Sequence, residues 1–140
     1  MAMRDLTDRV AWITGAGTGI GAAAAVALAA EGMRVVLSGR RVDRLDEVAR
    51  QIGARAEVMP LDVADKHAVL AMAGDILARH GRIDVLVASA GLNVRNRNWH
   101  DVTMDDWDTV IRVDLDGAFY CAHAGLPAMI AQGGGLIVNV

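Results

Sequence analysis

The sequence predicts an α/β fold, a doubly wound parallel sheet with helices on both faces, and two observations lead to this prediction. Short apolar runs alternate with helical segments along the chain, and the connections between them are short. The apolar runs are nearly continuous, which is typical of parallel strands covered on both sides. Five such strands are visible in the pattern.

Composition limits the class of protein. The chain has 140 residues, of which 54% are hydrophobic, so one domain with a sizeable core is expected. The formal net charge of -3 argues against nucleic acid or an anionic membrane as a partner. The longest apolar stretch, residues 22–30, is about half of what a bilayer crossing needs. With a single cysteine, Cys121, and no apolar block of signal-peptide length in residues 1–8, a cytoplasmic location is expected.

The first elements form a βαβ unit. Residues 9–13 are a short apolar run, residues 14–21 form a glycine-rich turn, and an Ala-rich helix continues to residue 30. Gly32 follows as the C-terminal cap of that helix. Residues 33–37 are the second apolar run, and they complete the unit.

The alternation of helix and strand then repeats. Residues 42–51 have the charged, amphipathic pattern of a helix, and residues 56–59 that of a strand. A second helix is expected over residues 65–80, because an aspartate stands at its start and a glycine directly after its end. Residues 83–88 are almost entirely aliphatic and form the fourth strand.

The last part of the sequence holds one long helix and one strand. After a polar loop at residues 93–101, Thr103 is the N-cap of a helix that continues to about Ala131, with two acidic residues in its favourable first turn. Three glycines at 133–135 lead into a fifth strand at 136–140. We expect this strand to lie at or next to an edge of the sheet that the 140 residues leave unfinished.

The strongest local signal is the turn from Thr14 to Gly21, which lies between a strand and a helix. Glycines allow the backbone to turn sharply and to approach a pyrophosphate, while the helix N-terminus offers unpaired N–H groups. A tight turn that holds no ligand is the alternative, but the flanking strand and helix favour phosphate binding. The candidate cofactor-binding residues here are Gly15, Thr18, Gly19, Ile20 and Gly21.

The spacing T-G-x-x-x-G-x-G in this turn resembles the fingerprint of the short-chain dehydrogenase/reductase family. Residues 61–63, 90–91, the helix 107–129 with Gly117 inside it, and residues 135–140 agree with the same family. The resemblance covers essentially the whole chain. It implies that residues 1–140 form one Rossmann-type NAD(P)-binding domain, incomplete at its C-terminus, of an oxidoreductase that moves hydride between the cofactor and a carbonyl or alcohol substrate.

By this resemblance, Asp62 and Val63 contact the adenine, the aspartate through the amino group and the valine through its backbone N–H. The alternative is that Asp62 only starts the next helix. Ser89, Ala90 and Gly91 are expected to contact the cofactor after the fourth strand.

The choice between the two nicotinamide cofactors depends on the end of the second strand. An acidic residue there would bind the ribose hydroxyls and repel a 2′-phosphate, but the chain has Gly39, followed by Arg40 and Arg41. Two guanidinium groups suit a phosphate. NADP is therefore predicted rather than NAD, and the alternative is that the two arginines are solvated and engage carboxylates of the following helix.

Two positions depart from the family pattern. The family usually has Asn-Asn-Ala-Gly where this chain has 88–91, Ala-Ser-Ala-Gly, so two amides that brace the sheet are missing. The active-site Asn of the family, which holds a water in the proton relay, corresponds to Asp114. We predict a catalytic role for Asp114 and expect it to add an ionisable group to a partly desolvated cleft; a solvated helix residue is the alternative.

The family's acid/base residues, a Ser shortly beyond the fifth strand and a Tyr-x-x-x-Lys pair on the next helix, have no counterpart in these 140 residues. The single tyrosine, Tyr120, is followed four positions later by Ala124, and we predict that it packs in the core. The 140-residue chain alone is therefore expected to be inactive. The alternative function is a catalytically silent dinucleotide-binding module or fragment.

No metal site is expected, because the four histidines share no ligand spacing and only one cysteine is present. Arg95 and Arg97 could meet an anionic substrate, but a solvated loop is favoured. The expected partner is a small alcohol or carbonyl compound. Family members often associate through the helix that contains Tyr120, so the resemblance also implies a homo-oligomer.

Overall fold

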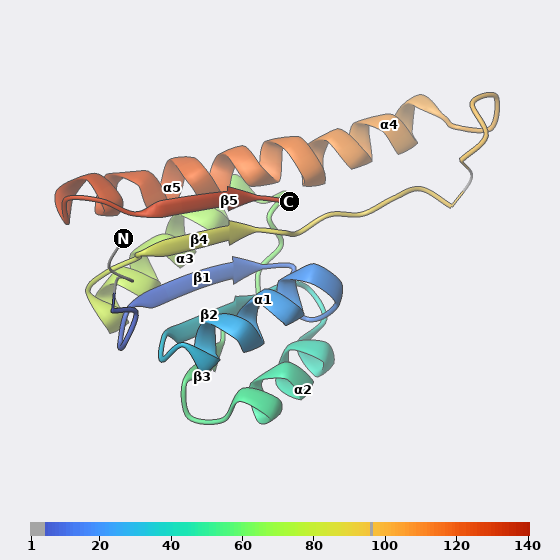
Figure 1. The fold of residues 1–140 in the computed structure, drawn as a ribbon. Coiled ribbons are helices and arrows are strands. Elements are labelled where there is room, and N and C mark those ends of the chain that lie inside the picture. Colours follow the sequence, from blue (N-terminus) through green and yellow to red (C-terminus); the bar gives the residue numbers. More distant parts are fainter. Residues whose placement is uncertain (1–4, 96) are drawn as a thin grey trace.

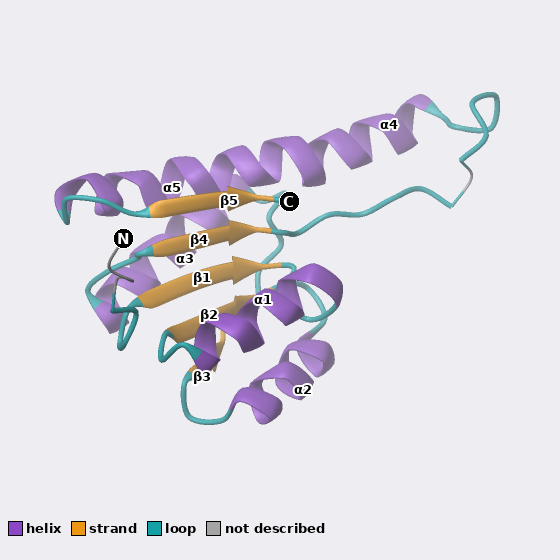
Figure 2. Ribbon diagram, in the orientation of Figure 1, coloured by secondary structure: helices purple, strands orange, loops and turns teal. Residues whose placement is uncertain are grey.

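A computed structural model describes residues 5–95 and 97–140. Within them the sheet consists of β1 (Val10–Thr14), β2 (Arg34–Ser38), β3 (Ala56–Val58), β4 (Val85–Ala88) and β5 (Leu136–Asn139). The helices are α1 (Gly19–Ala30), α2 (Val42–Ile52), α3 (Lys66–His80), α4 (Met104–Val110) and α5 (Gly117–Ala131), and a π-helical segment, η1 (Ile111–Asp116), joins the last two (Figures 1 and 2).

All neighbouring strands are parallel, in the order β3-β2-β1-β4-β5. From β1 the chain first builds outward to β3, then crosses back to place β4 and β5 on the other side of β1. Open sheets of this type form a crevice at the carboxyl ends of the strands where the direction reverses. The predicted fold class is confirmed.

Two hydrophobic cores lie on the two faces of the sheet, because successive side chains of a strand point in opposite directions. In β1, Ala11 and Ile13 belong to the core under α1 and α2. Val10 and Trp12 belong to the other core, which α3 and α5 cover. Figure 1 shows these two helix layers. The fully buried indole of Trp12 donates a hydrogen bond to the hydroxyl of Ser38 (3.1 Å), so its one polar group is satisfied.

Most predicted boundaries are within two residues of those observed, and the helix signals explain why. Asp65 is the N-cap of α3 and accepts hydrogen bonds from two backbone N–H groups, while Gly81 ends the helix in the left-handed conformation. Thr103 and Asp106 form a capping box at the start of α4. The C-cap of α1 is Glu31, and the predicted cap Gly32 is the next residue, with φ of 92°.

The start of α1 differs from the prediction in a way that matters. The glycine-rich turn was expected to extend to Gly21, but the helix already begins at Gly19. Gly19 has φ of 57°, a left-handed conformation that glycine adopts without strain, so the chain can turn sharply into the helix at this residue. The last two glycines of the motif therefore lie in the first turn of the helix.

The long helix expected from Thr103 to Ala131 is continuous, but its middle is the π-helical segment η1. A π turn widens the helix by one residue per turn and often marks a functional site. Just after this segment, Gly117 packs against the loop between β3 and α3. A Cβ on Gly117 would be 2.6 Å from Cγ2 of Val63. The hydrophobic periodicity of the sequence continues through this segment and does not reveal the change in hydrogen bonding.

β5 lies at an edge of the sheet, as predicted, and β4 and β5 begin at the same register level, Val85 beside Leu136. Leu136, Val138 and Val140 are exposed. In the part of the chain that the structure describes, none of the helices has the length and apolarity that a membrane crossing requires.

Candidate functional site

A groove of about 890 Å³ lies along the carboxyl ends of the strands. It extends from the residues after β2 and β3, past the glycine turn after β1, to the residues after β4 and β5. Twelve of the thirteen residues predicted from the sequence line it: Gly15, Thr18, Gly19, Ile20, Arg40, Arg41, Asp62, Val63, Ser89, Ala90, Gly91 and Asp114. The tertiary fold therefore brings together candidates from five separate segments of the sequence.

The glycine turn fits closely against the segment that follows β4. Gly15 has φ of 64°, and a Cβ there would lie 2.5 Å from the carbonyl oxygen of Ser89. At Gly19 a Cβ would meet no atom of the described residues within 4 Å, because this glycine faces the open groove. The first glycine thus allows contact between two protein segments, and the second leaves space for something else.

Gly21 is the predicted site residue that does not line the groove. A Cβ on Gly21 would lie 2.8 Å from the carbonyl carbon of Gly15, so a side chain would push α1 away from the turn. Its role is close packing of the helix on the strand end, which is the part that the third glycine plays in dinucleotide-binding turns.

The N-terminus of α1 points at this groove without a cap of its own. Within the described residues Thr18 is the N-cap but makes no side-chain capping hydrogen bond, and the first turn holds no acidic residue. The helices α3 and α4, in contrast, are capped by Asp65 and Thr103. Uncapped N–H groups and the positive end of the helix dipole favour an anionic ligand.

Thr14, at the end of β1, braces the segment that follows β4. Its buried hydroxyl accepts hydrogen bonds from the backbone N–H groups of Ser89 and Ala90, both at 3.2 Å. A hydroxyl on the neighbouring strand end therefore fixes this segment, although the two amides of the family pattern are missing. The sequence showed Thr14 as the first residue of the turn motif but did not indicate its hydrogen bonds to the segment after β4.

The two arginines after β2 lie at one end of the groove. Arg41 donates a hydrogen bond from Nη2 to the hydroxyl of Thr18 (3.2 Å), which links the arginine to the glycine turn. Within the described residues the carboxylates of Asp43 and Glu47 pair with Arg44 instead, at 3.9 and 3.0 Å. These two carboxylates therefore do not engage Arg40 or Arg41, while both arginines are exposed, as the solvated alternative expects.

Asp62 and Val63 follow β3 and face the same end. Oδ1 of Asp62 accepts a hydrogen bond from the backbone N–H of Ala64 (3.0 Å), which fixes a tight turn. The alternative for Asp62 was that it starts the next helix, but the N-cap of α3 is Asp65. Val63 is buried against Gly117.

Asp114 lies in η1 at the other end of the groove. Its side chain is exposed, yet Oδ1 accepts a hydrogen bond from the backbone N–H of Leu92 at 2.9 Å. The expected desolvation is therefore absent, because one side of the carboxylate is open to water. Asp114 is also more than a solvated helix residue, since it holds the segment after β4.

Sequence reasoning missed several groove residues, which are mostly apolar or lie beside a predicted one: Gly17, Gly39, Leu45, Leu61, Leu92, Asn93, Val113 and Val140. Of these missed residues, the sequence could have indicated only the ones that lie next to a motif. Arg95 and Arg97 are exposed and do not line the groove, in agreement with a solvated loop. Tyr120 is half-buried and packs against the core, as predicted.

Other chemically reactive groups lie away from the groove. Cys121 is fully buried, and burial raises the pKa of its thiol to about 12, so it stays protonated at neutral pH. Among residues 5–95 and 97–140 there is no cluster of three or more potential metal ligands.

The strand order, the two helix layers and the glycine turn define a Rossmann-like α/β protein. The family model of the short chain dehydrogenases matches residues 9–140, and the chain belongs to this short-chain dehydrogenase/reductase family.

Three relatives illustrate the similarity. An uncharacterized oxidoreductase of Staphylococcus aureus (strain N315) is 39% identical over 139 residues, which cover 99% of this chain and 60% of the relative. A metagenomic short-chain oxidoreductase, solved in complex with NADP, has a TM-score of 0.89 at 41% identity. The match covers 96% of this chain and 62% of the metagenomic chain. Serine dehydrogenase from Escherichia coli has a TM-score of 0.83 at 31% identity, with 91% and 59% covered. The chain thus spans about three fifths of the length of the relatives it matches.

Proposed function

We propose that this chain binds NADP(H) in the groove and forms the cofactor-binding domain, residues 1–140, of an oxidoreductase. The hydride would pass between the nicotinamide and a carbonyl or alcohol carbon of a small substrate. The single observation that supports this best is the open groove at the uncapped N-terminus of α1, with Gly19 facing into it. The catalytically silent alternative is not favoured, because the relatives carry the name oxidoreductase.

The residues present fit such a cofactor. The glycine turn and the first turn of α1 would hold the pyrophosphate through backbone N–H groups. Asp62 and Val63 would meet the adenine, and Ser89, Ala90 and Gly91 would lie along the nicotinamide half. The cofactor supplies the hydride chemistry, while these residues bind and orient it.

Arg40 and Arg41 support a preference for the phosphorylated cofactor. Both side chains line the groove, and the hydrogen bond from Arg41 to Thr18 holds its guanidinium beside the glycine turn. A 2′-phosphate would meet two positive charges and bidentate donors. The metagenomic relative with the TM-score of 0.89 was solved with NADP.

The test is a fluorescence titration with NADPH and with NADH. We expect NADPH to bind roughly tenfold tighter or more, because each charge-assisted hydrogen bond contributes about 1.5–3 kcal/mol. The double variant Arg40→Ala with Arg41→Ala should remove the difference. A matched control is Arg44→Ala with Arg50→Ala, which deletes two positive charges of α2 outside the groove and should keep the preference. Equal affinities in the unmodified protein would contradict the assignment.

Catalysis and assembly belong to the same proposal. Asp114 would lie at the nicotinamide end and would contribute to the active site there. No tyrosine of the chain has a lysine four positions on, since Tyr120 is followed by Ala124. We therefore propose that the 140 residues alone bind the cofactor without turnover. The homo-oligomer and the cytoplasmic location stay predictions.

A further inference from the structure

We propose that Asp114 makes the groove discriminate between the two redox states of the cofactor, in favour of the oxidised form. This inference rests on the proposed function, because it requires a nicotinamide dinucleotide in the groove. The relevant chemistry is simple: the oxidised nicotinamide ring carries one positive charge, and the reduced ring carries none.

Charges of opposite sign lie at opposite ends of the groove. Arg40 and Arg41 follow β2, whereas Asp114 lies beside the segment after β4. In the sheet order, β1 and its glycine turn lie between these two strands. Among the described groove residues the only other carboxylate side chain is that of Asp62, which follows β3 on the arginine side.

This order fixes which half of a dinucleotide reaches Asp114. A dinucleotide is a linear ligand, with its pyrophosphate between adenosine and the nicotinamide riboside. With the pyrophosphate at the glycine turn and the adenosine phosphate at Arg40 and Arg41, the nicotinamide occupies the remaining end. That end is lined by Gly91, Asp114 and Val140.

The carboxylate of Asp114 is held at the wall of this end of the groove. Leu92 donates its backbone N–H to Oδ1 at 2.9 Å, and the carboxylate also lies beside Gly91, where a Cβ would be 3.5 Å from Oδ1. An asparagine at this position would keep an oxygen acceptor for Leu92 but would carry no charge. The negative charge is therefore separable from the structural hydrogen bond.

A fixed negative charge lowers the free energy of a nearby cation and leaves a neutral ring almost unaffected. An exposed carboxylate is screened by water, so the effect is modest: about threefold to tenfold in relative affinity for charges some 5 Å apart or a little more. Because the cause is electrostatic, the effect should weaken as salt shortens the Debye length from about 30 Å at 0.01 M to about 3 Å at 1 M.

The experiment measures the dissociation constants of NADP⁺ and NADPH by calorimetry for the unmodified chain and for Asp114→Asn. We expect the variant to weaken NADP⁺ relative to NADPH by about threefold to tenfold at low salt. The control Asp108→Asn removes the same charge from α4 outside the groove, and it should leave the ratio unchanged. High salt should reduce the difference between Asp114→Asn and the unmodified chain.

The outcomes separate this inference from the proposed function. If neither dinucleotide binds, the proposed function fails, and this inference fails with it. If both bind and Asp114→Asn changes both affinities by the same factor, or neither, only the redox discrimination is overturned. A change of ratio that Asp108→Asn reproduces, or that high salt leaves unchanged, also overturns it.

Discussion

The two ends of the same parallel sheet differ in what their polar groups bind. At the amino ends of the strands, side chains pair with one another and with strand backbone. At the carboxyl ends, glycines, an uncapped helix N-terminus and two arginines face an open groove. The amino-end side of the sheet, called the closed edge below, is held by its own interactions, whereas the carboxyl-end side, called the open edge, leaves donors available to a ligand.

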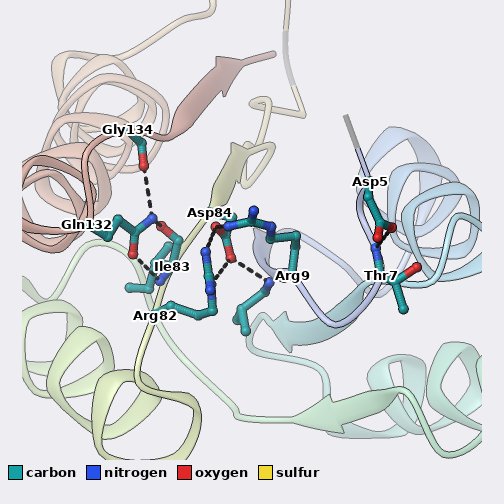
Figure 3. A network of polar contacts seen from close by, with 9 residues as sticks. Asp5, Thr7, Arg9, Arg82, Ile83, Asp84, Gln132 and Gly134 are labelled. Carbon is teal, nitrogen blue, oxygen red and sulfur yellow. Dashed lines mark hydrogen bonds and ion pairs between the residues drawn. The ribbon is translucent and has the colours of Figure 1, made fainter. Parts of the chain in front are cut away.

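Asp84 is the centre of the closed edge (Figure 3). Its side chain, 13% exposed, accepts hydrogen bonds from Arg82 and Arg9 and from the backbone N–H of Val10 (2.9 Å). Burial opposes ionisation, but the hydrogen bonds from Arg82 and Val10 outweigh it and hold the pKa of Asp84 below its usual range. The carboxylate thus ties the starts of β1 and β4 together.

Gln132 closes the same edge beside β5. Its amide donates to the carbonyl oxygens of Ile83 (2.7 Å) and Gly134 (2.9 Å), and its carbonyl oxygen accepts from the N–H of Ile83 (3.4 Å). Figure 3 shows this bridge between the segment before β4 and the turn before β5. The backbone groups of these connections are therefore satisfied within the protein.

The largest effect is expected at the open edge, from Gly19→Val. The added side chain would fill the space where backbone N–H groups must meet phosphate. Losing two charge-assisted hydrogen bonds of about 1.5 kcal/mol each weakens dinucleotide affinity roughly a hundredfold, measured by calorimetry. Circular dichroism on the same sample should show the fold retained.

Gly81→Val is the matched control for this variant. Gly81 also has positive φ (74°), and a Cβ there would meet no atom of the described residues within 4 Å, but this glycine ends α3 at the closed edge. It should cost about 1–2 kcal/mol or more in stability through strain, and leave the affinity for dinucleotide unchanged. Equal loss of affinity in both variants would show that strain, not the groove, is responsible.

The next effect concerns the closed edge, where Asp84→Ala should lower the free energy of unfolding by about 2–4 kcal/mol without changing dinucleotide affinity. The variant leaves the N–H of Val10 without its acceptor and two guanidinium groups without their carboxylate. Urea unfolding measures it. As a control, Asp8→Asn at the same edge should change stability by less than about 1 kcal/mol, because the ion pairs of Asp8 are exposed.

The pH dependence gives the same prediction an independent check. Since the pKa of Asp84 is lowered in the folded state, its contribution is complete above about pH 4 and is lost as the pH falls through the folded-state value. The stability difference between the unmodified chain and Asp84→Ala should therefore shrink in acid. A constant difference from neutral pH to about pH 3 would contradict the role given to the charge.

The smallest effect is expected for Thr14→Val, because the Thr14 hydroxyl lies at the open edge but binds the protein's own backbone. The isosteric change leaves the N–H groups of Ser89 and Ala90 without their acceptor and should cost about 1–3 kcal/mol in thermal or urea unfolding. Thr109→Val, which removes an exposed hydroxyl that donates to the backbone carbonyl of Asp105 in its own helix, should cost less than about 0.5 kcal/mol. Similar losses would show that the brace contributes little.

Much of the fold could be predicted from local patterns. The strand, turn and helix around Gly15 follow from apolar runs and glycines, and the caps Asp65 and Thr103 mark real helix starts. The π segment around Asp114 could not be predicted, because a change from i→i−4 to i→i−5 hydrogen bonds leaves the apolar pattern nearly unaltered. The site candidates came from motifs and family resemblance, and groove residues without a motif were missed.

The order and type of the elements and the position of the glycine turn follow from local sequence, because they depend on neighbours within a few residues. Which distant groups meet depends instead on how the strands are ordered in the sheet: Arg41 meets Thr18, Thr14 meets Ser89, and Asp114 meets Leu92. These partners are 22 to 75 residues apart. They meet because β1 lies between β2 and β4, so the loops at the carboxyl ends of these strands are brought side by side.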